Sequence, residues 1–370
     1  MMVALPGILQ AAEWSSQPWV KLRTEYSDNM QLRTGQTQEA HGGVLSAGLR
    51  LSRTDERGVL SLMPIVHVRR FDSKERLDSD DESLRLDWSR RGEQSVWGMN
   101  GEWTRDTTLT SELEVSGLVQ ARKPRIKRYL SPSFRYSLTS RSNVGVDVAY
   151  TTVKYGDALL TGLVDYDYAQ ADLSVTYLWS EQGTVTGMLY GTRLVAAQIG
   201  NRTNSGGVQL QLGGAMTERW DGNITAGAYR SHRNNGTDDK NGWLLDLSLS
   251  RKDERGRWRV GLSRGVDPSG TGVLVQRDQL SLSREHKLSE WWRLNMKGNW
   301  MINRDLRALP VSQDRRFRSA ALSLVRLLSR SWRLDAGYLY DWQRYAGATN
   351  QAERNLLMIA IQYNGASGEE

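Results

Sequence analysis

The chain has 370 residues, a formal net charge of +7 and a mean hydropathy of −0.56. It contains no cysteine, which excludes disulfide frameworks and thiolate metal sites. The absence of any run of about 18 apolar residues excludes a membrane-spanning helix. It does not exclude spanning β-strands, whose alternating apolar and polar residues keep the mean hydropathy low.

The N-terminal residues read MMVALPGILQAAEW and precede any strand pattern. Residues 3–12 resemble the apolar core of a secretory signal, with Ala11 and Ala12 before Glu13 as a candidate cleavage point, although a positive n-region is missing. An ordinary disordered N-terminus is the alternative. We interpret residues 1–12 as the remnant of a signal peptide and expect the folded domain to begin at Glu13.

From there, apolar residues recur at every second position in short runs, a pattern that predicts strands with one apolar and one polar face. In one hairpin, Leu130 and Phe134 should face an apolar phase together with Val144, Val148 and Tyr150, while residues 139–142 form the turn. The weakest of the runs are the ninth and the fourteenth. In chain order, the eighteen predicted strands are centred on residues 20–26, 45–51, 60–68, 84–88, 97–103, 130–136, 144–150, 171–179, 185–189, 208–212, 224–228, 243–249, 258–262, 280–282, 292–302, 320–324, 332–342 and 357–363.

Two classes of separator alternate strictly between these strands. The short, polar class comprises residues 54–58, 91–94, 139–142, 181–183, 217–221, 252–256, 287–290 and 329–331. The long class includes residues 28–40, 72–83, 105–124, 231–242 and 304–316. A β-propeller would need about four strands in each repeat, where this chain supplies two. The pattern therefore predicts an all-β protein, a single transmembrane up-and-down antiparallel β-barrel of 16–18 strands over residues 13–364, with short periplasmic turns, long external loops and a C-terminal tail at 365–370.

Aromatic residues lie near the ends of the predicted strands. Trp332 and Trp342 share one face and lie ten positions apart, a separation of about 33 Å along a strand that projects to about 25 Å at a 40° tilt. That is the height of the lipid-facing band between two aromatic girdles. We therefore expect a porin-like protein in the outer membrane of a Gram-negative bacterium, in contact with membrane lipid and lipopolysaccharide.

Several segments resemble the outer-membrane β-barrel proteins that accompany the PEP-CTERM/exosortase sorting system and exopolysaccharide clusters. They are residues 12–14 (AEW), 24–29 (TEYSDN), 42–45 (GGVL), 83–97, 107–117 (TTLTSELEVSG) and 161–166 (TGLVDY). The resemblance implies a barrel in the outer membrane and a link to exopolysaccharide export or PEP-CTERM protein sorting. It implies no catalytic residues. An aromatic terminal residue, common in outer-membrane strands, is absent here, because Tyr363 is followed by seven more residues.

Charged residues fall opposite the apolar positions of the strands, so we expect them to face the lumen, since charge on the lipid face costs roughly 2–4 kcal/mol at mid-bilayer. Arg318 is expected there as well. The predicted lumen-lining residues are Arg23, Arg50, Arg69, Arg85, Glu102, Arg135, Asp147, Asp172, Asp246, Arg259, Arg293, Lys297, Arg333 and Asp335. A barrel of 16 to 18 strands leaves an aqueous channel unless a loop folds inward, so a water-filled pore is predicted. The basic excess predicts a weak anion preference. The alternative is that these charges pair across neighbouring strands and only hold the wall together. The basic residues form no patch with interleaved aromatics, so nucleic acid is not an expected partner.

Neither an enzyme nor a cofactor is predicted. The four histidines lack metal spacing and no HExxH or GxSxG motif occurs, so His67 is interpreted as a wall histidine. Asp78, Asp80, Asp81 and Glu82 are assigned to an external loop, either solvated or bridged to lipopolysaccharide by divalent ions. The longest loop, 105–124, is the candidate to fold inward as a constriction.

Three functions stay open from the sequence. The first is a passive or export pore, with exopolysaccharide or secreted protein as cargo. The second is an occluded structural or assembly-scaffold barrel without transport activity, and the third is a membrane-embedded enzyme. Lumen aromatics would favour sugar as cargo, but only Tyr190 and Tyr229 have plausible inward parity. The sequence does not indicate an oligomeric state.

Overall fold

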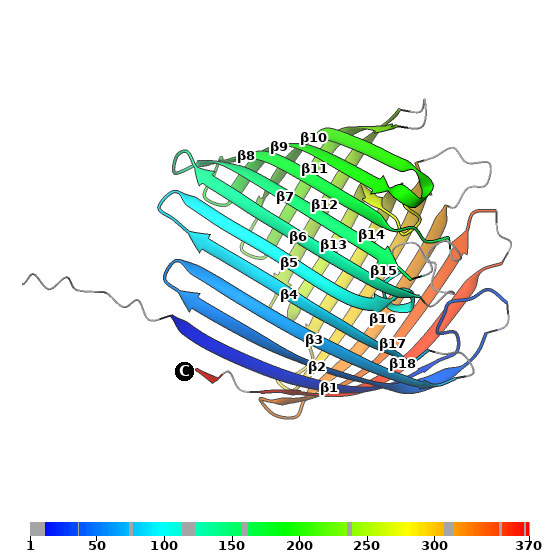
Figure 1. The fold of residues 1–370 in the computed structure, drawn as a ribbon. Coiled ribbons are helices and arrows are strands. Elements are labelled where there is room, and N and C mark those ends of the chain that lie inside the picture. Colours follow the sequence, from blue (N-terminus) through cyan, green and yellow to red (C-terminus); the bar gives the residue numbers. More distant parts are fainter. Residues whose placement is uncertain are drawn as a thin grey trace, which may run out of the picture.

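Eighteen long antiparallel strands close into a barrel in the computed structural model, which describes residues 12–35, 37–73, 77–112, 123–156, 162–234, 239–306, 314–347, 350–365 and 368–369 (Figure 1). The barrel strands are β1 (Glu13–Ser27), β2 (Ala40–Asp55), β3 (Gly58–Asp72), β4 (Ser79–Arg91), β5 (Ser95–Thr107), β6 (Pro124–Ser137), β7 (Ser142–Tyr155), β8 (Tyr166–Leu178), β9 (Gly183–Ala196), β10 (Asn201–Ala215), β11 (Trp220–Arg233), β12 (Lys240–Asp253), β13 (Gly256–Pro268), β14 (Leu274–Lys287), β15 (Trp292–Asp305), β16 (Arg315–Leu327), β17 (Trp332–Tyr345) and β18 (Ala352–Asn364). Among the described residues, the short helices α1 (Thr108–Ser111) and η2 (Ala197–Ile199) lie in loops.

Each strand pairs with its neighbours in sequence, and β1 closes the ring against β18, with Trp19 opposite Asn364. Short turns connect the strands at one end of the barrel and longer loops at the other (Figure 1). The predicted strand number and up-and-down order are confirmed. Short and long connections alternate as predicted except between β9 and β10, where residues 197–200 form a connection no longer than the longest turns at the other end. The predicted signal segment, residues 1–12, lies outside the described residues except for Ala12.

The strands run further than the alternating runs that predicted them. The two weak runs, 185–189 and 280–282, are the centres of full-length strands β9 and β14. Backbone pairing extends past the apolar segment because polar residues beyond the lipid can still complete the ladder. For the same reason β4 begins at Ser79, inside a segment that we assigned to an external loop. In the predicted tail, the two residues of β19 (Gly368–Glu369) pair with Ser15 and Ser16 of β1.

The outer face of the barrel is apolar. In β7, Val146, Val148 and Tyr150 are between 41% and 49% exposed, whereas Asp147 pairs with Ser133 on the inner face. Because an antiparallel register carries the same face from strand to strand, this alternation extends around the ring. A closed barrel that is apolar outside and polar inside is an outer-membrane structure, with its short turns in the periplasm. Within the described residues, no helix has the length and apolar character needed to cross a bilayer.

Tryptophans mark both edges of the apolar band, and arginines stack on them. At the short-turn end, Arg326 of β16 lies over Trp292, with 5.3 Å between its Cζ and the ring centroid. At the long-loop end, Arg318 of the same strand lies 5.4 Å from Trp300 and 4.8 Å from Trp342. The prediction that Arg318 faces the lumen is therefore wrong. Its guanidinium stacks on indole rings at the edge of the band, where a long cationic side chain can reach the aqueous interface.

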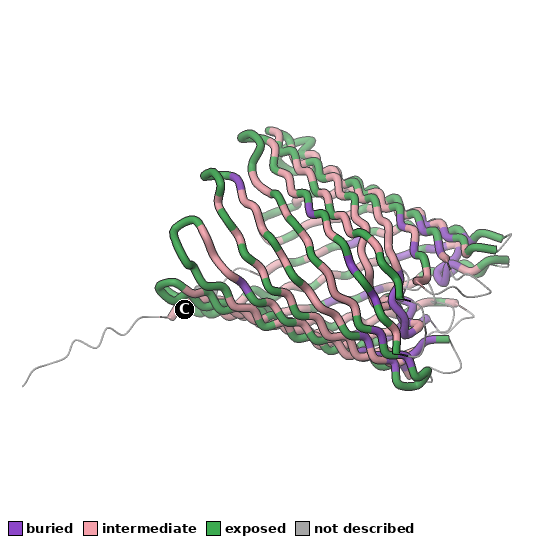
Figure 2. Tube along the Cα trace, turned by 90° about the horizontal axis from the view of Figure 1, so that it is seen from above, coloured by how far each residue is buried: buried purple, intermediate pink, exposed green. Residues whose placement is uncertain are grey.

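Buried residues gather at the long-loop end and inside the barrel (Figure 2). One cluster includes Leu109 of α1 and Leu356 of β18, and another includes Leu163, which precedes β8, and Leu194 of β9. The remainder of the interior is lined by polar and charged side chains. The apolar core therefore lies across one mouth of the barrel rather than along its axis.

Candidate functional site

The register places all fourteen predicted lumen-lining residues on the inner face, opposite the exposed apolar side chains. Arg23 and Asp335, for example, flank Ala360 on the inner face of three adjacent strands. Asp147 and Asp172 are opposite each other on β7 and β8. The wall that these residues share with their neutral neighbours is the candidate functional site. Whether each charge can act on a passing ion depends on whether a neighbouring side chain of opposite charge pairs with it.

Many of the inner charges are held in ion pairs. Lys127 lies 2.9 Å from Glu102, Arg69 lies 3.1 Å from Asp81, and Arg135 lies 4.0 Å from Asp147. Asp335 receives both Lys21 and Arg333, at 3.2 Å and 3.7 Å. Most of these contacts join neighbouring strands or residues of one strand, and Lys21–Asp335 spans β18 to join β1 with β17. They therefore brace the wall and cancel part of its charge.

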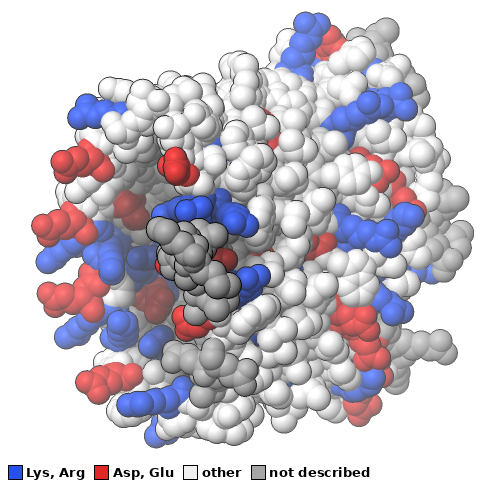
Figure 3. Space-filling model, turned by 60° about the vertical axis from the view of Figure 1, so that its left-hand side comes forward, with Lys and Arg blue, Asp and Glu red and all other residues white. Residues whose placement is uncertain are grey.

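Other inner cations have no carboxylate partner. Across the described part of the chain, no carboxylate oxygen lies within 4.0 Å of Arg50, Arg259, Arg293 or Lys297. Arg85 has none within this distance either, but it is directly opposite Glu102 in the register. Several of them lie toward the short-turn end of their strands, including Arg259 near the start of β13 and Arg293 near the start of β15. The molecule is hollowed at that end, and Lys and Arg side chains are visible within the opening (Figure 3).

The basic residues are unevenly distributed around the ring. The inner positions of β7 to β11 carry no Lys or Arg apart from Arg233, at the very end of β11. This sector presents hydroxyls, amides and tyrosines, with Asp147 and Asp172 as inner carboxylates. The inner wall therefore has one sector that is neutral to acidic and another, made of the remaining strands, that is basic.

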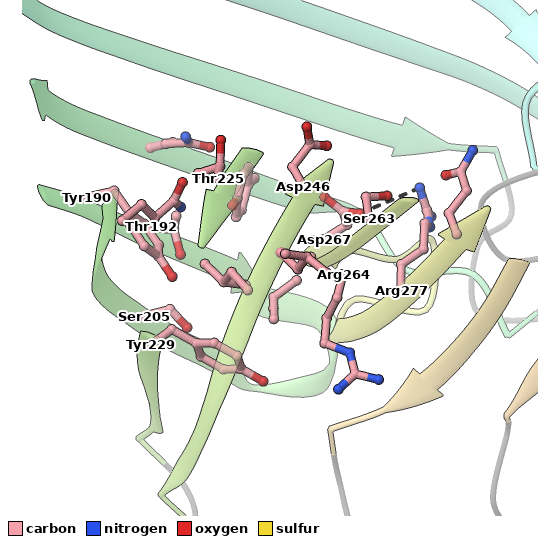
Figure 4. A pocket seen from close by; sticks show the side chains of 18 residues that line it. Tyr190, Thr192, Ser205, Thr225, Tyr229, Asp246, Ser263, Arg264, Asp267 and Arg277 are labelled. Carbon is pink, nitrogen blue, oxygen red and sulfur yellow. Dashed lines mark ion pairs between the residues drawn. The ribbon is translucent and has the colours of Figure 1, made fainter. Parts of the chain in front are cut away.

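A recess of about 330 Å³ lies in the lumen wall at the edge of the neutral sector (Figure 4). Tyr168, Tyr190 and Tyr229 line it, together with the hydroxyl and amide groups of Thr192, Ser205, Gln209, Thr225, Ser263 and Gln279 and the carboxylate of Asp246. Tyr190 and Tyr229 thus have the inward placement that their parity predicted. The side-chain oxygen of Ser205 is buried and has no hydrogen-bond partner among the described residues.

Glycines let two of these tyrosine rings lie against the wall. Gly207 pairs with both Tyr190 and Tyr229, and Gly242 pairs with Tyr229 on the next strand. A Cβ added at Gly207 would lie 2.8 Å from the Tyr190 ring, and one at Gly242 would lie 2.5 Å from the Tyr229 ring. The row therefore alternates tyrosine and glycine, and any larger residue at the glycines would push the rings toward the lumen axis.

The mouth at the long-loop end is narrowed by three loops that meet inside the barrel. Glu112, which follows α1 and is fully buried, accepts a hydrogen bond of 2.6 Å from the Oη of Tyr155. Arg125 lies 3.5 Å from the same carboxylate and forms two 3.0 Å bonds to Asp106. The loop between β13 and β14 closes on this group, because a Cβ added at Gly270 would lie 2.6 Å from Glu112 Oε2.

Backbone and side-chain bonds tie the other loops together across the lumen. The Val164 amide donates to the Gly270 carbonyl at 2.8 Å, and Asn201 Nδ2 donates to the Gly272 carbonyl at 2.7 Å. Val164 and Gly270 belong to loops that are six hairpin connections apart in an antiparallel ring of strands spaced about 4.8 Å apart. They can touch only by projecting inward. Away from the β13–β14 loop, Leu109 of α1 packs with Met30, in the loop after β1, and with Leu356 of β18.

The described part of the longest loop therefore folds inward, as its length predicted, while residues 113–122 lie outside the described residues. Sequence reasoning did not identify Glu112, Tyr155 or Gly270 as a constriction. A signal existed: Glu112 lies in the TTLTSELEVSG segment and Val164 in the TGLVDY segment, the two that carried the family resemblance.

The structure agrees with the prediction for His67 and differs from the prediction for the acidic residues at 78–82. His67 Nδ1 lies 2.7 Å from the Ser46 hydroxyl on the inner face, as expected for a wall histidine. The acidic run at 78–82 is not an external loop cluster. It enters β4, where Asp81 turns inward to Arg69 and Asp80 turns outward to Arg70 at 2.7 Å, because strand alternation sends adjacent side chains to opposite faces.

Comparison with known proteins finds likeness in the fold alone. No family model and no curated protein matches the sequence. Among solved structures, OccAB4 of Acinetobacter baumannii has a TM-score of 0.53 at 10% identity, covering 98% of this chain and 100% of that one. A BenF-like porin from Pseudomonas fluorescens Pf-5 has a TM-score of 0.53 at 9% identity, with coverage of 98% and 100%. OccK2 (OpdF) of Pseudomonas aeruginosa, solved in complex with glucuronate, has a TM-score of 0.51 at 11% identity, with coverage of 95% and 98%.

Proposed function

We propose that this protein is a channel of the outer membrane that passes small polar solutes and weakly prefers anions. The observation that carries the proposal is the polar inner wall with its uncompensated cations, Arg50, Arg259, Arg293 and Lys297. Positive groups without a partner raise the local concentration of anions, because the low-dielectric wall of a pore focuses their field. The paired charges contribute little, since each ion pair is close to neutral at a distance.

Planar-bilayer recording tests this function directly. Purified protein in a potassium chloride gradient should give steady single-channel openings. Their reversal potential should have the sign of the chloride equilibrium potential. A cation-preferring reversal potential would overturn the anion preference while leaving the pore in place.

A recess with tyrosine rings makes small sugars or sugar acids the favoured cargo. Tyr168 and Tyr190 offer flat apolar faces beside hydroxyl and amide donors, and sugars present both C–H faces and hydroxyl groups. Glucuronate, bound by the fold neighbour OccK2, is a suitable probe. In current recordings it should produce brief blockades that shorten in Tyr190→Ala. Blockades of unchanged duration in this variant would remove the recess from the transport path.

The link to exopolysaccharide export or to PEP-CTERM protein sorting rests on the sequence resemblance alone. A deletion strain that still exports polysaccharide and still sorts PEP-CTERM proteins at normal levels would contradict it. The narrowed mouth argues against wide polymers or folded proteins as cargo.

An occluded scaffold barrel is the second candidate, and the three loops that meet at Glu112 are the observation that favours it. It predicts electrical silence of the intact protein. Silence that persists after Glu112→Ala, in a barrel that still folds, would support the scaffold and overturn the channel.

A further inference from the structure

Three arginines form a cluster on the outer, lipid-facing side of the barrel at the long-loop end. Arg316 and Arg318 lie on β16, and Arg344 lies on β17. Arg316 is directly opposite Arg344 in the register, and Arg318 is opposite Trp342. All three side chains are exposed, and they face outward with Leu322 and Tyr338 rather than into the lumen.

Stacking on tryptophan fixes two of these guanidinium groups. The Cζ of Arg318 lies 4.8 Å and that of Arg344 lies 5.9 Å from the centroid of the same Trp342 ring. Arg318 also lies 5.4 Å from Trp300 on β15. Cation–π contacts of this kind orient the charge but do not neutralise it.

The positive charge of the cluster is not balanced by the protein. Within the described ranges, none of the three arginines has a carboxylate oxygen within 4.0 Å. The adjoining segments 307–313 and 348–349 contain no Asp or Glu. Two acids lie beside the cluster: Asp314 precedes Arg316 by two residues, and Glu353, opposite Trp342, receives a 2.7 Å hydrogen bond from Gln351. Neither places a carboxylate oxygen within 4.0 Å of the three arginines. Two like charges opposite each other across strands are destabilising, so the Arg316–Arg344 pair is unfavourable unless an anion lies between them.

A neighbouring arginine shows what a balanced site looks like. Arg264 of β13 stacks on Trp243 at 3.9 Å, in the same way as Arg318 stacks on Trp342. It is also held by Asp278 through hydrogen bonds of 2.6 Å and 2.9 Å. Asp278 also pairs with the outward-facing Arg304 of β15. The chain thus supplies a counter-ion to Arg264 and Arg304 and omits one for Arg316, Arg318 and Arg344.

The position of the cluster along the membrane normal indicates which ligand it meets. Trp300 and Trp342 mark the edge of the hydrocarbon band, and Arg344 lies two residues beyond Trp342, or about 5 Å further toward water along a strand tilted by 40°. Phosphate groups of membrane lipids lie at this level. Because long loops face outward in outer-membrane barrels, the leaflet in contact is the outer one, whose lipid is lipopolysaccharide.

We propose that Arg316, Arg318 and Arg344 bind a phosphate group of lipopolysaccharide, with Trp342 as the platform that holds the guanidinium groups in place. Arginine binds phosphate oxygens in a bidentate manner, and three guanidiniums around one phosphate satisfy it while relieving their mutual repulsion. This site is independent of the proposed channel function, because it lies on the opposite face of the wall.

Binding of defined lipids to the purified protein tests the proposal. We compare the wild type with the triple variant R316Q/R318Q/R344Q, using bisphosphorylated lipid A, dephosphorylated lipid A and inorganic phosphate as probes in native mass spectrometry. R326Q is the matched control, since Arg326 stacks on tryptophan on the same strand and the same face, but at the short-turn end. The wild type and R326Q should bind bisphosphorylated lipid A alike, and the triple variant should bind it at least tenfold more weakly.

A competition experiment distinguishes the lipid headgroup from free phosphate. Millimolar inorganic phosphate should not displace bisphosphorylated lipid A from the wild type. Equal binding by the triple variant, an equal loss in R326Q, or equal binding of dephosphorylated lipid A by the wild type would each overturn the proposal. Heat-modifiable migration in gels reports folding. If the triple variant does not fold, R316Q/R344Q, which removes only the unpaired cross-strand charges, is subject to the same criteria.

Discussion

The phenolic oxygen of Tyr155 lies 2.6 Å from Oε1 of Glu112 and ties the inner wall of the barrel to a loop that crosses its mouth. Glu112 is fully buried, and Arg125 at 3.5 Å is its cationic neighbour. A buried carboxylate that loses one of its partners is costly, so this contact sets how firmly the loop is held.

Tyr155→Phe removes the hydroxyl and leaves the ring. We expect a loss of about 1–3 kcal/mol in the free energy of unfolding, together with more frequent current fluctuations, because the loop is held less firmly. Urea unfolding in lipid vesicles and single-channel recording measure the two effects. Tyr150→Phe is the matched control, since that residue faces lipid on the same strand; equal effects of the two variants would argue against a special role for Tyr155.

Gly270→Ala tests the closure of the three loops. A Cβ at this position would lie 2.6 Å from Glu112 Oε2 and 2.9 Å from the Tyr155 hydroxyl, so the loops must separate. Single-channel conductance should rise relative to the wild type. Gly265→Ala is the control, because a Cβ there meets no atom within 4 Å, and a conductance change of the same size in both variants would contradict the prediction.

Charge selectivity should depend on the uncompensated cations of the lumen. R293Q/K297Q removes two of them from β15 and should shift the reversal potential in a salt gradient toward cation preference. Arg326→Gln removes an outward charge near the same end and should leave selectivity unchanged. An unchanged reversal potential in R293Q/K297Q would contradict the role assigned to these two cations in selectivity.

A new charge should destabilise the protein far more on the lipid-facing side of β7 than on its lumen-facing side. Val148 faces lipid and is 41% exposed, and the adjacent Ala149 faces the lumen. Val148→Arg should cost roughly 2–4 kcal/mol of unfolding free energy, because it places a cation at mid-bilayer, while Ala149→Arg should cost far less. Chemical unfolding in bilayers gives both values. Similar losses for the two variants would contradict the assigned facing of the strand.

The sequence by itself determined the secondary structure, the strand number and the facing of the wall. Alternation is a property of adjacent residues: Val146, Val148 and Tyr150 share a face whatever strand lies beside them. The short and long separators likewise required only local composition. The facing of Arg318 was predicted wrongly, because charged residues were expected to avoid the lipid-facing side along the whole strand. A guanidinium that stacks on Trp300 and Trp342 is stable at the edge of the apolar band.

Only the tertiary structure decided which charges are cancelled and where the mouth narrows. Whether Arg69 is neutralised and Arg293 is not depends on which strands are neighbours and on their register, which alternation does not encode. The contact of Glu112 with Tyr155 and Gly270 joins three loops from different parts of the ring. Their meeting depends on a closed barrel around them, because only closure brings loops from distant strands over the same opening.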